Sequence, residues 1–547
     1  MSDPTLLQEP ATERRNWWTY VDRYQWYVLA MCALAWMFDC ADQMIFTSSR
    51  SIAMRDLMPG ALESAQISNG TIATTLFMIG WATGGLIFGI IGDKWGRAKT
   101  MGLTVFLYAA FTGLSALSQN WWQFAISRFV TGFGVGGEFA AGAALVADVM
   151  PREARAQALG LLQALSAIGN IIGAKMLTVV TWHGLAGSNE HLIWRYLYLA
   201  GALPAIIAVF VLVRLKEPEK WVQAKLAAKK SGVNNFGRIS DLFTNPRWLR
   251  NTIVGLALAI SGVIGVWGIG FYSPELIDTT FPPMSAAAGN TVEALLAEPA
   301  DARGADIHAL DATCKLVDEK GKPTAAATDA KNALEGYRRL LGRTAAHGEV
   351  IPTDLGTVVL TAERQQKIGA LLAKRMDPKE GASLKSNALV LQQVGAFFGM
   401  WMFSVLAVRI GRRWSFAIAF ALAWASIWIV FLGFHEKNQI WYLFPLLGFC
   451  TLLPFGGYAV YFPEIFPTRL RTTGTGFCYN VGRYVASLGP LAFGGLLTVF
   501  AGRFDIAAFR VAAVVVASIY IVGIIASFMG PETMNQPLPE DAYGAAH

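Results

Sequence analysis

Long apolar runs constrain the fold of this chain more than any other feature. Residues 252–271 and 509–529 are two examples, and each has about the 20 residues that a helix needs to cross a bilayer. Because lipid offers the backbone no hydrogen-bond partners, such runs must form helices. Only 15% of the 547 residues are charged, whereas soluble chains have about a quarter. The sequence therefore predicts an all-α membrane protein.

Twelve such runs predict twelve membrane-spanning helices. The expected spans are 27–47, 70–92, 100–118, 121–146, 157–181, 193–214, 252–272, 387–408, 414–433, 438–462, 473–500 and 508–529. The polar residues 1–26 lack the pattern of a cleavable signal, and we expect them to form a tail.

The basic residues indicate how the chain is oriented. Residues 215–250, between spans six and seven, carry eight Lys or Arg against three Asp or Glu. Lys and Arg close to span ends stay in the cytoplasm, so both termini should be cytoplasmic, with the protein in a plasma membrane such as a bacterial inner membrane. The net charge of +7 is explained by this bias and does not indicate nucleic-acid binding.

An internal repeat divides the chain. Three segments recur in the same order: Asp148–Gly160 as Glu464–Gly476 after 316 residues, Lys94–Arg97 as Arg409–Arg412 after 315, and Pro218-Glu219 as Pro531-Glu532 after 313. Two copies of a six-helix unit are expected, with a site between them. The predicted parts are a tail 1–26, a first bundle 27–214, a cytoplasmic linker 215–250, a second bundle 251–273 with 387–530, and a tail 531–547.

The second copy is interrupted by an insertion. Spans one and seven begin about 225 residues apart and spans two and eight about 315 apart, so roughly 90 extra residues separate spans seven and eight. We expect residues 274–386 to lie on the extracytoplasmic side. A tolerated loop and a functional element that contacts a partner both remain open.

The loop after span two carries a recognisable motif. It reads Gly89-Ile-Ile-Gly-Asp93-Lys94-Trp-Gly96-Arg97-Ala-Lys99 and resembles the signature of the major facilitator superfamily. The stretch Arg128–Glu138 is similar to the same family's glycine-rich fourth helix. The ends of the two copies, at 217–221 and 531–533, resemble those of sugar porters.

The resemblance implies a twelve-helix transporter with alternating access. It implies that Gly89, Asp93, Lys94, Gly96, Arg97 and Lys99 form a conformational latch, in which Asp93 accepts hydrogen bonds from a neighbouring helix N-terminus. The second copy has Val408 at the Asp93 position and Ser404 at the Gly89 position, so the latch should work mainly in the first copy. The branch resembles sugar porters, organic-ion transporters and aromatic acid:proton symporters.

Ionisable residues inside predicted spans are candidates for coupling. They are costly in lipid and usually face a cavity or a partner. Asp39 and Asp42 share one helix face, and two neighbouring carboxylates in a low dielectric suit a proton carrier. The candidate proton-coupling residues are Asp39, Asp42, Glu138 and Arg128. The alternative for Asp39 is a structural pair with Arg128 or with another helix.

A cation in span eleven is the candidate substrate anchor. Arg483 offers bidentate binding to a carboxylate, and Asn480 and Tyr479 precede it closely. Together with Trp36, these residues form the predicted substrate site. The alternative for Arg483 is a structural pair with a membrane carboxylate.

These observations favour one function among several. We expect a proton-coupled symporter for a small organic anion, a carboxylate that includes aromatic ones. A proton-independent facilitator of a sugar or polyol and a non-transporting membrane sensor are the alternatives. All six histidines fall outside the spans and no nucleotide-binding loop is present, so neither an enzyme nor a cofactor or metal site is expected. The protein is predicted to be monomeric.

Overall fold

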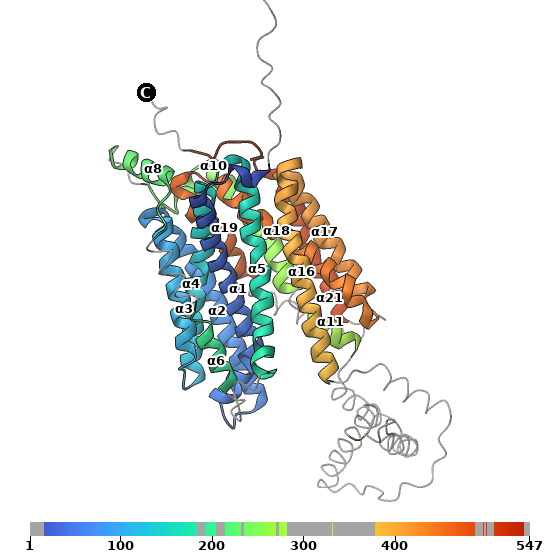
Figure 1. The fold of residues 1–547 in the computed structure, drawn as a ribbon. Helices are drawn as coiled ribbons and strands as arrows, with labels where there is room; N and C mark the ends of the chain where they lie inside the picture. The colour runs from blue at the N-terminus through green and yellow to red at the C-terminus, as the bar shows by residue number, and fades with distance from the viewer. Residues whose placement is uncertain are drawn as a thin grey trace, which may run out of the picture. The chain divides into compact units, whose positions relative to one another are not determined.

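The computed structural model describes residues 16–182, 192–203, 214–230, 235–269, 273–281, 331, 378–486, 496, 499 and 508–540. Within these ranges the regular secondary structure is helical (Figure 1). Contacts group the chain into two compact units, a larger one of residues up to 271, 390–434 and 438 onward, and a smaller one of 272–389 and 435–437. All sites discussed below lie within the larger unit.

The first half of the chain folds into helices at the expected spans. They are α1 (Arg23–Leu57), α2 (Glu63–Trp95), α3 (Arg97–Ser115), α4 (Trp121–Val149), α5 (Arg152–Trp182) and α6 (Ile193–Ala200). Helices α1, α2, α4 and α5 extend beyond the predicted spans because hydropathy marks the lipid-facing part only, whereas the backbone hydrogen bonds continue into the polar flanks. Helix α3 begins before its predicted span and ends at Ser115, three residues before the predicted end. Only the beginning of the sixth span, 193–214, is well covered by the described residues.

The second half contains a matching series. It comprises α10 (Pro246–Gly268), α16 (Pro378–Ile410), α17 (Arg412–Gly433), α18 (Ile440–Ile465), α19 (Arg471–Ala486), α21 (Ala508–Ala517) and α22 (Ile519–Met529). The predicted span 508–529 is divided into two helices at Ser518. There the N–H groups of Ser518 and Ile521 bond to the carbonyls three residues earlier, those of Val515 and Ser518, instead of four residues earlier as in an α-helix. Most of the second part of the span 473–500 lies outside the described residues.

Short helices occupy the predicted linker and part of the insertion. The linker contains α8 (Glu219–Lys230) and α9 (Asp241–Thr244), a single turn η5 (Thr468–Leu470) precedes α19, and α11 (Ser273–Thr280) follows α10. Apart from 274–281, 331 and 378–386, the predicted insertion lies outside the described residues. In the described part of the chain, nine helices are long and apolar enough to cross a membrane.

Close packing of α2 on α4 shapes the first half. A Cβ added to Gly84 would overlap the carbonyl of Phe133, and one added to Gly136 would overlap that of Trp81. Small residues allow two membrane helices to approach to backbone contact. As a result α4 is enclosed, with residues 134–148 all buried, and the charged side chains of α4 are held inside the protein.

Candidate functional site

Arg483 lies in α19 and is a buried cation. Its side chain is 2% exposed. Its Nη1 donates hydrogen bonds to the Tyr479 carbonyl and to Asn480 Oδ1, each at 3.0 Å. The guanidinium carbon lies 4.0 Å from the ring centroid of Trp81 and 4.2 Å from that of Tyr479. Among the described residues no carboxylate lies within ion-pair distance, so the groups in direct contact with this charge are π faces and neutral acceptors.

Two carboxylates near Arg483 lack donors. Asp39 of α1 and Glu138 of α4 are each 1% exposed. Within the described part of the chain, neither oxygen of Asp39 has a hydrogen-bond partner, and neither does Oε2 of Glu138. Asp39 interacts electrostatically with both Glu138 and Arg483. Because a charged carboxylate without donors is costly in an apolar surrounding, this pair is suited to take up a proton.

Aromatic rings connect α1 to α19 beside these groups. The rings of Trp36 and Phe139 lie 4.8 Å apart, and those of Phe139 and Tyr479 stack at 4.2 Å. Trp36 Nε1 is buried and makes no hydrogen bond to the described residues. Sequence reasoning missed Phe139, whose one signal was its position directly after Glu138. The four residues predicted for substrate binding therefore belong to one cluster with Asp39 and Glu138, here called the central cluster.

Arg128 and Asp42 form a separate group. Arg128 Nη1 lies 3.2 Å from Asp42 Oδ2, and the guanidinium also donates to the hydroxyls of Ser115, Thr112 and Thr131 at 3.0–3.2 Å. The alternative pair of Arg128 with Asp39 is not formed. The structure thus divides the predicted coupling residues into two groups, because Asp42 takes the cation and Asp39 does not.

A second polar site lies where the loop after α2 meets α19, which we call the gate end. Asp93 accepts hydrogen bonds from the backbone N–H groups of Thr472 (3.1 Å) and Thr473 (2.8 Å) and from Thr473 Oγ1 (2.7 Å). These residues begin α19, so the carboxylate binds a helix N-terminus in the other half of the chain. Gly89 contributes its carbonyl to the Thr473 hydroxyl.

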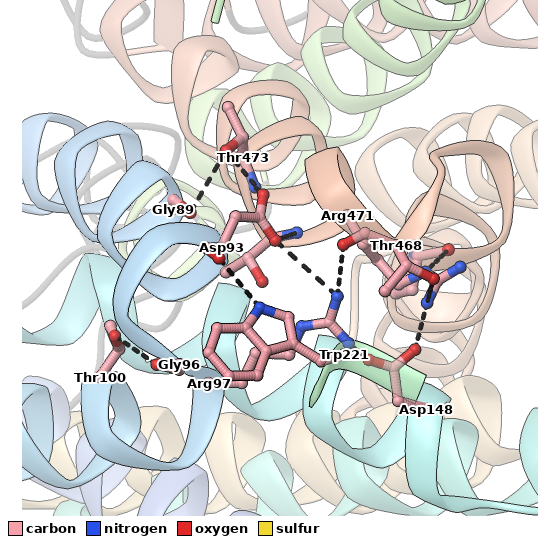
Figure 2. A network of polar contacts seen from close by, with 12 residues as sticks. Gly89, Asp93, Gly96, Arg97, Thr100, Asp148, Trp221, Thr468, Arg471 and Thr473 are labelled. Carbon is pink, nitrogen blue, oxygen red and sulfur yellow. Dashed lines mark hydrogen bonds and ion pairs between the residues drawn. The ribbon is translucent and has the colours of Figure 1, made fainter. Parts of the chain in front are cut away.

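Ion pairs extend this contact, as Figure 2 shows. Arg97 and Arg471 both pair with Asp148, and Arg97 Nη2 donates to the Thr468 carbonyl at 2.8 Å. We call Asp93, Arg97, Asp148 and Arg471 the first latch. It joins α2, α3 and α4 to the segment that begins α19.

The remaining motif residues have other positions. Lys94 and Lys99 are exposed, and the Lys94 carbonyl accepts from Lys225 at 2.7 Å. Gly96 has a φ of 126°, a conformation that favours glycine. Glu217 accepts from the N–H groups of Arg97 (2.7 Å) and Lys99 (3.1 Å) and so caps α3.

Helix α17 has a cap equivalent to that of α3, and it changes one of the residue pairings of the sequence repeat. Glu532 accepts from the N–H groups of Arg412 (2.9 Å) and Arg413 (3.2 Å) at the start of α17. The counterpart of Glu532 is therefore Glu217, 315 residues earlier. The sequence comparison paired it with Glu219 at 313, which was wrong because the capping carboxylate, not the neighbouring proline, is the repeated feature.

Comparisons with known proteins agree on one family. A sequence profile described as Major Facilitator Superfamily matches residues 31–292. A Haemophilus influenzae protein named for metabolite transport is 25% identical over 95% of this chain and 99% of its own. The cis,cis-muconate transport protein of Acinetobacter baylyi is 21% identical over 87% and 89%.

Solved structures show the same fold. The proton:xylose symporter XylE, bound to 6-bromo-6-deoxy-D-glucose, superposes with a TM-score of 0.60 at 14% identity, covering 94% of this chain and 98% of that one. The XylE match shows the fold alone. With the apolar helices and the motif after α2, the profile match over residues 31–292 and the full-length relatives named for transport support a membrane transporter of the major facilitator superfamily.

Proposed function

We propose that this transporter is a proton-coupled symporter of a small organic anion, a carboxylate that includes aromatic ones. The observation that carries the proposal is Arg483, a buried arginine without a carboxylate partner among the described residues and flanked by the rings of Trp81 and Tyr479. A guanidinium in this setting favours a planar carboxylate, which it can bind through two parallel hydrogen bonds. The muconate transport activity in the name of a relative supports the same substrate class.

Proton coupling is assigned to Asp39, with Glu138 as its partner. The two carboxylates interact with each other, so neutralising one lowers the cost of keeping the other charged. Asp39 also interacts with Arg483. Protonation of Asp39 removes a negative charge with which Arg483 otherwise interacts, so the guanidinium attracts the incoming anion more strongly, which links proton binding to substrate binding. Asp42 and Arg128 form a separate, structural pair.

The latch sets the conformational cycle. In the described state the first latch joins the two halves of the chain at the gate end, and the positive-inside bias predicts that this end is cytoplasmic. Opening requires that Asp93 release the start of α19. A ligand that binds the two arrangements unequally shifts their populations, and this drives alternating access.

Uptake into proteoliposomes tests the coupling. We would measure uptake of labelled muconate and benzoate with and without an inward proton gradient, for the wild type and for Asp39→Asn. With one proton per anion, a gradient of one pH unit supports about tenfold accumulation. We expect Asp39→Asn to lose this accumulation and to keep exchange of internal for external substrate, because exchange needs no net proton movement.

Exchange is also the folding control for the variant. Gradient-driven accumulation that survives Asp39→Asn would refute the coupling assignment. Movement of sugars regardless of the gradient, with no carboxylate uptake, would replace the proposal by a facilitator. Ligand binding without any uptake would replace it by a sensor.

A further inference from the structure

A cavity of about 210 Å³ lies at the gate end between the two halves of the larger unit. Its walls come from the start of α5, the end of α16, the start of α17, the end of α18 and the segment after α22. The residues that matter here are Arg152, Arg155, Val408, Arg412, Glu464 and Thr533.

The sequence repeat explains where this cavity is. In the second copy, the residues that correspond to Asp93, Arg97 and Asp148 are Val408, Arg412 and Glu464, 315 or 316 residues later. The residue of the first copy that corresponds to Arg471 is Arg155, 316 residues earlier. We call these four residues the second latch. All four line the cavity, so the cavity is the second copy of the latch with one carboxylate missing, because Val408 occupies the position of Asp93.

The charges of the second latch are incompletely matched. Arg412 binds Glu464 through Nε (3.0 Å) and Nη2 (2.7 Å), and Thr533 Oγ1 donates to the same carboxylate at 2.5 Å. Glu464 therefore already has three donors. The start of α5 adds Arg152, Glu153 and Arg155, so the cavity has three arginines and two glutamates in its walls.

Arg155 interacts electrostatically with Glu464 but forms no close ion pair with a carboxylate of the described residues. It is 6% exposed. Its Nε donates to the Ala147 carbonyl at 2.9 Å and its Nη2 to the Met150 carbonyl at 3.5 Å, while Nη1 makes no hydrogen bond to the described residues. Its counterpart Arg471 pairs directly with Asp148. A guanidinium nine-tenths buried, with a donor left over at the wall of a polar cavity, indicates a site for an anion.

We propose that this cavity binds a small oxyanion, a phosphate or a carboxylate, in place of the carboxylate that Val408 lacks. The anion accepts hydrogen bonds from Arg155 of the first half and lies beside Arg152 and Arg412. It thereby joins α5 to α16 and α17 as Asp93 joins α2 to α19. A bound oxyanion stabilises the closed gate end, so the anion concentration on that side controls how readily the gate opens. The proposal does not depend on the substrate of the central cluster.

The test is binding of labelled inorganic phosphate to the purified full-length chain in phosphatidylcholine nanodiscs, at constant ionic strength in chloride. We expect saturable binding and a phosphate-dependent rise in the unfolding temperature. Val408→Asp supplies the missing carboxylate and should abolish both effects, whereas the matched variant Val408→Asn should keep them. Arg155→Gln should weaken phosphate binding about tenfold or more, since it removes a charge-assisted hydrogen bond.

Two results would overturn the proposal: absence of saturable phosphate binding by the wild type, or equal binding by Val408→Asp and Val408→Asn. Arg155→Gln keeps the test decisive if Val408→Asp does not fold.

Nanodiscs that contain phosphatidate distinguish the sources of the oxyanion. Competition by phosphatidate for the labelled phosphate, in the wild type and not in Arg155→Gln, would identify a lipid headgroup, and no competition would identify a soluble anion. Because binding is measured without transport, its failure is separate from any failure of the symport proposal.

Discussion

At the residue scale, Arg128 shows how a membrane helix keeps a charge. Its guanidinium has one carboxylate partner, Asp42, and three hydroxyl partners, and it lies 4.7 Å from the centroid of the Tyr198 ring. The hydrogen-bonding capacity of the cation is therefore used within the first half of the chain. This pattern is that of a structural pair, unlike Arg483.

Arg128→Gln should destabilise the protein strongly because it leaves Asp42 buried without a counter-charge. The expected loss is about 3–5 kcal/mol of unfolding free energy. Unfolding of the purified protein by heat or by a denaturing detergent measures it. The double variant Asp42→Asn with Arg128→Gln should recover most of the loss, since no uncompensated charge remains.

A comparison of Asp42→Asn with Asp39→Asn tells which of the two carboxylates of α1 couples protons to transport. If Asp42 has only a structural role, the ratio of gradient-driven accumulation to substrate exchange in Asp42→Asn should equal that of the wild type. In Asp39→Asn this ratio should fall. Loss of accumulation with exchange retained in Asp42→Asn would show that the coupling group includes both residues.

At the element scale, the starts of α3 and α17 depend on carboxylates from distant segments. Glu217 caps α3 and Glu532 caps α17. Burial alone would raise the pKa of Glu532, but the N–H groups of Arg412, Met534 and Arg413 outweigh it and hold the pKa below its usual 4.5. A depressed pKa in the folded state means that the stabilisation is present above the unfolded pKa and is lost as the pH falls through the folded one.

Glu532→Gln should therefore cost stability at neutral pH and little in acid. A lost helix cap costs about 0.5–2 kcal/mol, and the difference from the wild type should shrink as the pH falls below about 4.5. Unfolding temperatures from about pH 2.5, below the depressed pKa, to pH 7 measure this dependence. Glu219→Gln is the matched control, since Glu219 is exposed and caps neither α3 nor α17. An equal deficit for Glu532→Gln at every pH would exclude the charged cap.

At the scale of the whole molecule, the two latches make the gate end asymmetric. The first latch contains its own carboxylate at Asp93, whereas the second has Val408 and a cavity. Asp93→Val makes the first latch resemble the second. It removes three hydrogen bonds to a charged acceptor, so the population open at the gate end should rise about tenfold or more.

Spin labels at Lys99→Cys and Trp414→Cys measure this population by their distance distribution, since both side chains are exposed at the starts of α3 and α17. Lys94→Gln is the control, because the exposed Lys94 side chain belongs to the same motif and makes no hydrogen bond or ion pair to the described residues. An unchanged distance distribution in Asp93→Val would show that Asp93 does not hold the gate closed.

Sequence alone determined much of the architecture. The apolar runs specify where α1 to α5 and α16 to α18 form, because run length and lipid burial are local properties of the chain. The resemblance of the loop after α2 to a family motif implied that Asp93 binds a helix N-terminus, and the repeat identified Val408 as the departure in the second copy. The buried charges Asp39, Glu138 and Arg483 stood out because charge in an apolar run is rare.

Tertiary structure decided which of these groups meet. Asp39 and Asp42 share a helix face, so either could have taken Arg128, and the hydroxyls of Thr112 and Ser115 on α3 position that cation for Asp42. Glu217 rather than Glu219 caps α3 because the path of the linker brings its carboxylate to the N–H groups there. The cavity at Val408 likewise depends on side chains from five separate segments. Such pairings depend on distances between elements remote in the chain, and local sequence contains no measure of those distances.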